Sequence, residues 1–80
     1  MEYVLTTHAR EEVARRQIDL SWVDLVMAHP EQKLAGAGNR TILQSRIEAD
    51  GRIFLVRCVV EEWRNPPAVV TVYRTTKIAK

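Results

Sequence analysis

A histidine near the start of the chain, and an arginine and a tyrosine in its second half, carry side chains suited to chemistry on a phosphodiester. His8 is the best acid or base candidate, because an imidazole titrates near neutral pH. Arg57 can hold a phosphate with its planar guanidinium, and Tyr73 can stack on a base or donate its hydroxyl. Cleaving RNA without a metal needs a base for the 2′-OH, an acid for the leaving oxygen and cations for the charged transition state. These three side chains are therefore the catalytic candidates.

Further basic side chains could hold phosphate groups beside them. The phosphate-binding candidates are Arg16, Arg46, Arg74 and Lys77. Glu12 lies one helical turn after His8, where its carboxylate could orient the imidazole or act as a partner base. The same carboxylate could instead form an i,i+4 ion pair with Arg16 on the helix surface.

Each catalytic candidate also has an ordinary structural interpretation. A histidine at a helix start can serve as a capping or hydrogen-bonding residue, and Arg57 can belong to a solvated strand face. Tyr73 lies in a valine-rich strand, where it could pack in the core. Neither histidine has metal-ligand spacing to Cys58, so we expect no metal and no cofactor.

Length and composition restrict the chain to a single domain over residues 1–80. With one cysteine, no recognisable signal peptide and no apolar run near the ~20 residues that span a bilayer, we expect a cytoplasmic protein. The formal charge is +2, but residues 1–39 carry four basic and six acidic side chains, whereas residues 40–80 carry eight and four. The second half is basic enough to attract a phosphate-rich partner.

Apolar spacing predicts two helices in the first half of the chain. Thr7 can cap a first, short helix. A second helix starts with the capping pattern of Ser21 and Asp24 and ends before Pro30, with His29 at its C-terminus. Residues 35–39, which contain two glycines, read as a connector.

The second half predicts strands. Asp50 and Gly51 form a two-residue hairpin turn, which pairs residues 41–49 with residues 52–60. One face of this hairpin is almost wholly apolar, and the other places Gln44 beside Arg57. Residues 68–75 read as a third antiparallel strand whose register stays open. A simple return brings Arg74 near Arg57, and a one-residue shift sends it to the core face.

These elements predict an α+β fold, with two N-terminal helices packed on one face of a three- to four-stranded antiparallel sheet. The opposite face is open and carries Gln44, Arg46, Arg57 and, in one register, Arg74. An exposed edge of the third strand could pair two copies into a homodimer.

The chain resembles a small bacterial family, domain of unknown function 4258, in residues 7–18, 21–23, 29–31 and 69–78. That family is generally grouped with the RelE, ParE and BrnT toxins of toxin–antitoxin pairs. The resemblance implies the compact ribonuclease-toxin fold, with helices on one side of an antiparallel sheet and an RNA site on the other.

Individual positions carry this resemblance. His8 matches the histidine that opens the family's first helix, Arg16 matches the arginine before its Gly-Ile, and Tyr73 and Arg74 match its closing strand. Glu12 departs from the pattern, because the family commonly has arginine there.

Two functions stay open at this point. The first is a RelE/BrnT-like toxin-type domain acting on RNA, a metal-independent endoribonuclease with His8 as acid or base and arginines holding phosphate. Its expected partners are RNA and a cognate antitoxin protein, and no membrane. The second is a non-catalytic protein- or nucleic-acid-binding module with a regulatory role, suggested by Glu12 at a usually basic position.

Overall fold

The computed structural model describes residues 2–76, and its longest elements are the two strands joined by Asp50 and Gly51. These strands are β3 (Thr41–Ala49) and β4 (Arg52–Glu61). The two turn residues have φ angles of 52° and 73°, the left-handed backbone that a tight hairpin turn requires. The predicted antiparallel register is confirmed at every position of the hairpin.

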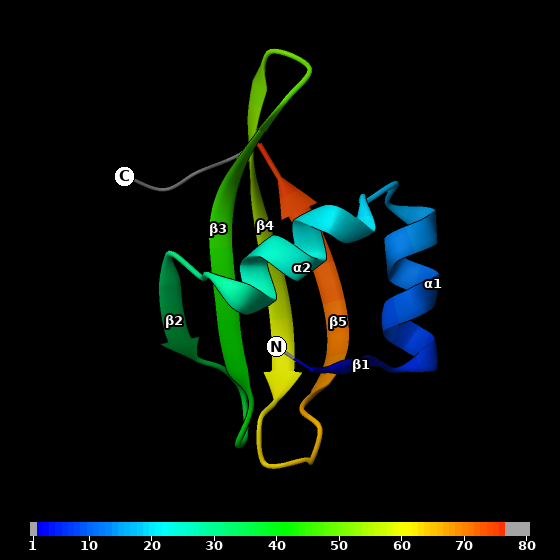
Figure 1. Ribbon diagram of the computed structural model, residues 1–80, viewed down its shortest axis with the longest axis vertical. Helices are drawn as coiled ribbons and strands as arrows, with labels where there is room; N and C mark the ends of the chain where they lie inside the picture. The colour runs from blue at the N-terminus through cyan, green and yellow to red at the C-terminus, as the bar shows by residue number, and fades with distance from the viewer. Residues whose placement is uncertain (1, 77–80) are drawn as a thin grey trace.

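Three shorter strands extend the hairpin into a mixed sheet. β5 (Ala68–Thr75) pairs antiparallel with β4, β2 (Gln32–Ala35) pairs antiparallel with β3, and β1 (Val4–Leu5) pairs parallel with β5. The sheet order is β1-β5-β4-β3-β2 (Figure 1). The predicted α+β class is confirmed. The prediction of three or four antiparallel strands is wrong, because the described chain has five and one of them is parallel.

The two strands that were not predicted as part of the sheet, β1 in a segment expected to be extended and β2, lack the sequence pattern of a strand. β1 spans two residues, and all four residues of β2 are exposed. A strand is recognised in sequence by its alternation of buried and exposed positions, which neither segment offers. Both exist because a longer neighbour supplies backbone hydrogen bonds.

The first helix, α1 (Thr7–Arg15), begins one residue earlier than predicted. Its cap is Thr6 instead of Thr7. The Thr6 backbone is extended, and its Oγ1 accepts a hydrogen bond from the Ala9 N–H at 3.1 Å. α1 stands beside β5 (Figure 1). The β5 edge that we expected to be exposed is therefore flanked by α1 and β1, and β2 forms the other edge of the sheet.

The second helix, α2 (Leu20–Ala28), is capped by Asp19, whose carboxylate accepts a hydrogen bond from the Ser21 N–H at 2.8 Å. The prediction that the capping pattern starts at Ser21 is wrong. The cap lies two residues earlier, at Asp19, and the helix begins at Leu20. The end is confirmed, with His29 as the C-cap before Pro30. The side chains that α2 buries are Val23, Val26 and Met27.

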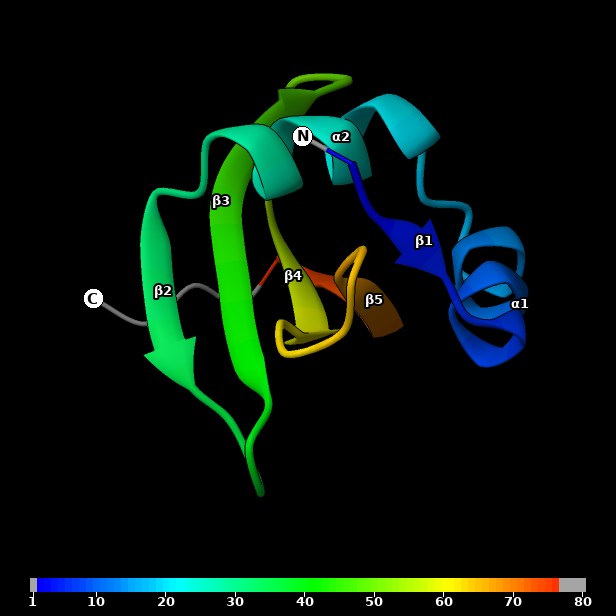
Figure 2. The same cartoon turned by 60° about the horizontal axis from the view of Figure 1, so that its bottom comes forward.

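Both helices share one hydrophobic core with the sheet. α2 crosses one face of the sheet, over β3 and β4 (Figures 1 and 2). The buried strand residues on this face include Leu43, Val56, Cys58 and Val72. Alternate strand residues point the other way. We call that other side the open face, since no helix of residues 2–76 covers it (Figure 2); it carries Gln44, Arg46, Arg57, Val59, Thr71 and Tyr73.

An irregularity between β4 and β5 decides the register that the sequence left open. Val59 pairs with Thr71 but Val60 pairs with Val69, so Val70 is an extra residue in β5. Beyond this bulge Tyr73 lies opposite Arg57 on the open face.

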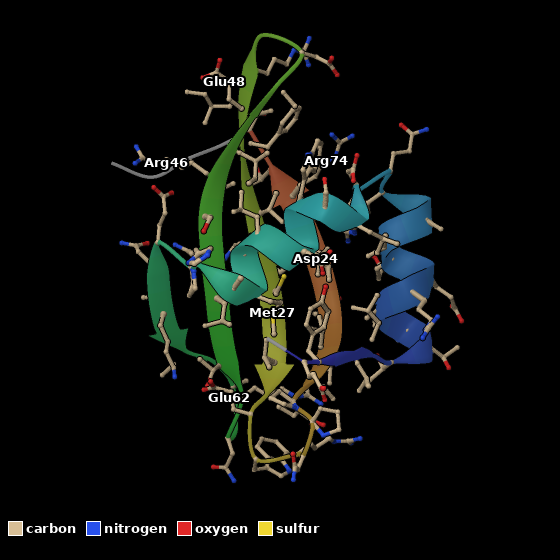
Figure 3. All side chains as sticks on the ribbon, viewed as in Figure 1. Asp24, Met27, Arg46, Glu48, Glu62 and Arg74 are labelled. Carbon is tan, nitrogen blue, oxygen red and sulfur yellow. The ribbon has the colours of Figure 1, made fainter. Side chains whose placement is uncertain are left out.

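Arg74 follows from the same register. It lies opposite Val56, on the helix side of the sheet, and Figure 3 labels it close to α2. The register that would bring Arg74 to the open face near Arg57 is therefore wrong.

Candidate functional site

Arg57 and Tyr73 form the centre of the open face. The pairing of β4 with β5 sets them side by side, and the guanidinium carbon of Arg57 lies 5.3 Å from the centroid of the Tyr73 ring. This is a cation–π contact. Among the described residues Arg57 has no ion-pair partner, and its Nε is buried without a hydrogen-bond acceptor. The two side chains together present a positive charge on an aromatic support.

The nearest paired carboxylate further along β4 on this face does not neutralise Arg57. Glu61 is 7% exposed and forms ion pairs with Arg40 at 3.3 Å and Arg64 at 2.7 Å. Its charge is therefore held at the β4–β5 loop end of the sheet. The Arg57 guanidinium keeps its capacity to bind an external anion or acceptor.

Gln44 lies directly opposite Arg57 on β3 and is 8% exposed. Its Nε2 donates to the Oε1 of Gln32 on β2, which fixes the orientation of the Gln44 amide. The Gln44 Oε1 is buried and has no hydrogen-bond donor within residues 2–76. The open-face cluster, by which we mean Gln44, Arg57 and Tyr73, therefore contains one unmatched acceptor beside one unmatched donor.

His8 belongs to a different group of charges on α1, centred on Glu12. The Glu12 carboxylate accepts hydrogen bonds from Arg15 at 2.6 and 2.8 Å and from the Nε of Arg16 at 2.6 Å. These hydrogen bonds, those of Arg15 first, lower the pKa of Glu12 from 4.5 to about 2. The His8 Nε2 is 4.0 Å from the Glu12 Oε1. We call these four residues the α1 cluster.

The chemistry of the α1 cluster follows from this pairing. Glu12 is 8% exposed and stays ionised at neutral pH, so it is a poor proton acceptor but can attract a protonated His8. Arg16 forms the i,i+4 ion pair that the sequence offered as one alternative. The His8 side chain is 64% exposed, which leaves its imidazole accessible.

Two of the remaining phosphate-binding candidates, Arg46 and Arg74, are engaged elsewhere. Arg46 donates to Glu31 through Nε at 3.2 Å and through a terminal nitrogen at 3.1 Å, and lowers the pKa of Glu31 to about 2. Arg74 stacks on Phe54, its guanidinium carbon 4.8 Å from the ring centroid, and Phe54 in turn stacks on Trp22. Lys77 lies outside the described residues.

The structure thus brings together two of the three catalytic candidates. Arg57 and Tyr73 touch, whereas His8 lies on α1, and β5 separates α1 from β4 (Figure 1). Sequence reasoning placed Gln44 beside Arg57 but gave it no role, and it missed Gln32, because β2 was not predicted. The signal available for Gln44 was the hairpin register itself.

Among residues 2–76, the groups needed for metal, thiol or membrane chemistry are not assembled. Within residues 2–76, no cluster of three or more His, Cys, Asp or Glu side chains is placed to hold a metal ion. Burial raises the pKa of Cys58 to about 12, so its thiol is a poor nucleophile. No helix in the described part is long and apolar enough to cross a membrane.

Comparison with known proteins gives the family. The model of the family described as "Domain of unknown function (DUF4258)" matches residues 5–74. The chain belongs to DUF4258. No curated protein and no solved structure matches it. The part that matches the DUF4258 model contains both the α1 cluster and the open-face cluster, so each is carried on the family domain itself.

Proposed function

We propose that the chain is a RelE/BrnT-type domain that acts on RNA, with the RNA strand bound on the open face at Arg57 and Tyr73. One observation carries the proposal. Arg57 rests on the Tyr73 ring and has no carboxylate partner in the described chain. A free guanidinium binds a phosphate or a base edge in bidentate fashion, and an aromatic ring beside it stacks on bases.

Catalysis in this proposal depends on His8 as the acid or base. The imidazole is exposed on α1, which stands beside β5, so the RNA strand would have to extend from β4 across β5 to α1. Arg57 and Tyr73 would then hold the strand while His8 transfers a proton at a neighbouring phosphodiester. Glu12, whose Oε1 is 4.0 Å from the imidazole Nε2, would orient the ring.

Binding is tested with purified protein and fluorescently labelled single-stranded RNA. Arg57→Ala should weaken binding about tenfold or more, the loss expected for one charge-assisted contact. Arg52→Ala is the matched control, because Arg52 is exposed, has no ion-pair partner in residues 2–76 and lies outside the open face. Equal losses in the two variants would contradict the site. Absence of RNA binding by the wild-type protein would contradict the function.

Cleavage is tested with the same RNA in the presence of a metal chelator. Wild-type protein should cut the RNA, His8→Ala should bind it without cutting, and Tyr73→Phe separates stacking from proton donation. Cleavage by His8→Ala at the wild-type rate would remove His8 from the mechanism.

A non-catalytic RNA-binding module is the second candidate, and one observation favours it. The imidazole lies in the α1 cluster, apart from Arg57 and Tyr73, and the arginines next to it are already paired with Glu12. Binding that depends on Arg57, together with intact RNA after prolonged incubation, would support this candidate over the nuclease.

A further inference from the structure

Two polar atoms of neighbouring residues on the open face lack partners. The Gln44 Oε1 acceptor and the Arg57 Nε donor are both buried, and neither has a hydrogen bond within residues 2–76. Their residues face each other across β3 and β4. Buried polar groups in folded proteins are almost always bonded, so an unmatched pair of this kind calls for a specific explanation. A ligand that supplies a donor for the Gln44 oxygen and an acceptor for the Arg57 Nε would satisfy both atoms.

The hydrogen-bonding groups that Gln44 and Arg57 offer define that ligand. The Gln32 Oε1 accepts one Nε2 hydrogen of Gln44, and the Gln44 Oε1 is left in need of a donor. Arg57 offers only N–H groups and needs acceptors. The Tyr73 ring, 5.3 Å from the guanidinium carbon, restrains the guanidinium and adds an aromatic surface for stacking. The ligand is therefore flat, with acceptors next to an N–H.

We propose that Gln44 and Arg57 recognise a guanine base in single-stranded RNA, an inference that rests on the proposed RNA-binding function. Guanine presents the acceptors N7 and O6 to an arginine fork, and its N1–H lies next to O6, where it can donate to the Gln44 oxygen. Adenine places an amino group where the fork needs an acceptor. Uracil has an N3–H beside its O4 carbonyl but no acceptor that corresponds to N7, so the fork would have a single acceptor there, which makes uracil the second-best base.

The experiment compares pentaribonucleotides that differ only in the central base, AAGAA, AAUAA, AACAA and AAAAA, by fluorescence anisotropy with wild-type protein. AAGAA should bind about tenfold more tightly than AAAAA, the discrimination expected for one bidentate base contact. Replacing the guanine by 7-deazaguanine removes N7 and should reduce this preference. Replacing it by hypoxanthine keeps N7, O6 and N1–H and should preserve it.

Variants assign the preference to the two side chains. Gln44→Met removes the acceptor while keeping the length of the side chain, so it should abolish the preference for AAGAA over AAAAA. Thr71→Val is the control, because it removes a hydroxyl from the same face at a position that the proposal does not use. Thermal melting confirms that both variants fold.

The outcomes separate the two proposals. Binding of all four pentamers with equal affinity overturns guanine recognition and leaves the RNA-binding function standing. A guanine preference that survives Gln44→Met overturns the role of Gln44. Failure of every RNA to bind overturns guanine recognition together with the proposed function.

Discussion

The α1 cluster and the open-face cluster use the same side chain in opposite ways. On α1, Arg15 and Arg16 share one carboxylate, that of Glu12, through hydrogen bonds of 2.6 to 2.8 Å. On the open face, Arg57 has an aromatic ring in place of a carboxylate. The first group satisfies its own charges, and the second leaves a cation unmatched.

The comparison shows that exposure is a poor guide to the availability of an arginine. The Arg15 side chain is 65% exposed, yet its guanidinium is bonded to both oxygens of Glu12. Arg57 is only partly exposed, yet no carboxylate in the described residues engages it. Capacity to bind phosphate depends on which charges the fold has already paired.

The largest effect on RNA affinity is expected when Arg57 is given a carboxylate partner. Gln44→Glu places one directly across from it, so the guanidinium should become paired as on α1. RNA affinity should then fall about tenfold, because a charge-assisted contact is lost and a negative charge is added. Anisotropy titrations measure this, and thermal melting confirms that the variant folds. Unchanged RNA affinity would mean that Arg57 does not contact the RNA.

The reverse change removes the carboxylate from α1. Glu12→Gln releases Arg15 and Arg16, which should strengthen RNA binding a few-fold. It should also steepen the dependence of log K on log salt concentration by about 0.7 for each new phosphate contact with single-stranded RNA. Titrations at several salt concentrations give the slope. A slope equal to that of wild type would show that the RNA does not reach α1.

The pairing of Glu12 also predicts how stability depends on pH. The pKa of Glu12 is lowered from 4.5 to about 2 in the folded protein, and that of Glu31 likewise. A carboxylate with a lowered pKa stabilises the fold above its unfolded pKa, and this contribution is lost as pH falls towards the folded value. The free energy of unfolding should therefore decrease between pH 4.5 and 2. Glu12→Gln should flatten that decrease, and an unaltered profile would contradict the ion pairs on α1.

The smallest effect is expected at Arg74. It was a phosphate-binding candidate, but it lies on the helix side and stacks on Phe54. Arg74→Ala should change RNA affinity by less than about twofold, within the range of a residue outside the interface. A loss as large as that of Arg57→Ala would extend the RNA-binding surface to the helix side.

Local signals predicted most of the fold. The turn at Asp50 and Gly51, together with alternating apolar residues, determined the register of the central hairpin, and Pro30 marked the end of α2. The edge strand β2 escaped prediction because its stability comes from pairing with β3, which its exposed residues do not reveal.

The site was harder to predict than the fold, since it depends on contacts between distant residues. The pairing of Glu12 with Arg16 was foreseeable, because helical spacing alone brings them together. The contact of Arg57 with Tyr73 was not, because it depends on a bulge without a sequence signature. The pairing of Arg46 with Glu31 needed the placement of β2 beside β3.

Val70 determines which chemistry the last strand offers to each side of the molecule. If Val70 paired with Val59 in a regular ladder, instead of bulging, the residues after it would change phase, so that the phenol of Tyr73 turned inward and the guanidinium of Arg74 turned outward. A relative of the same length whose last strand pairs without the bulge would present two cations and no ring to its ligand. Strand phase, and not only side-chain identity, therefore sets what this domain can recognise.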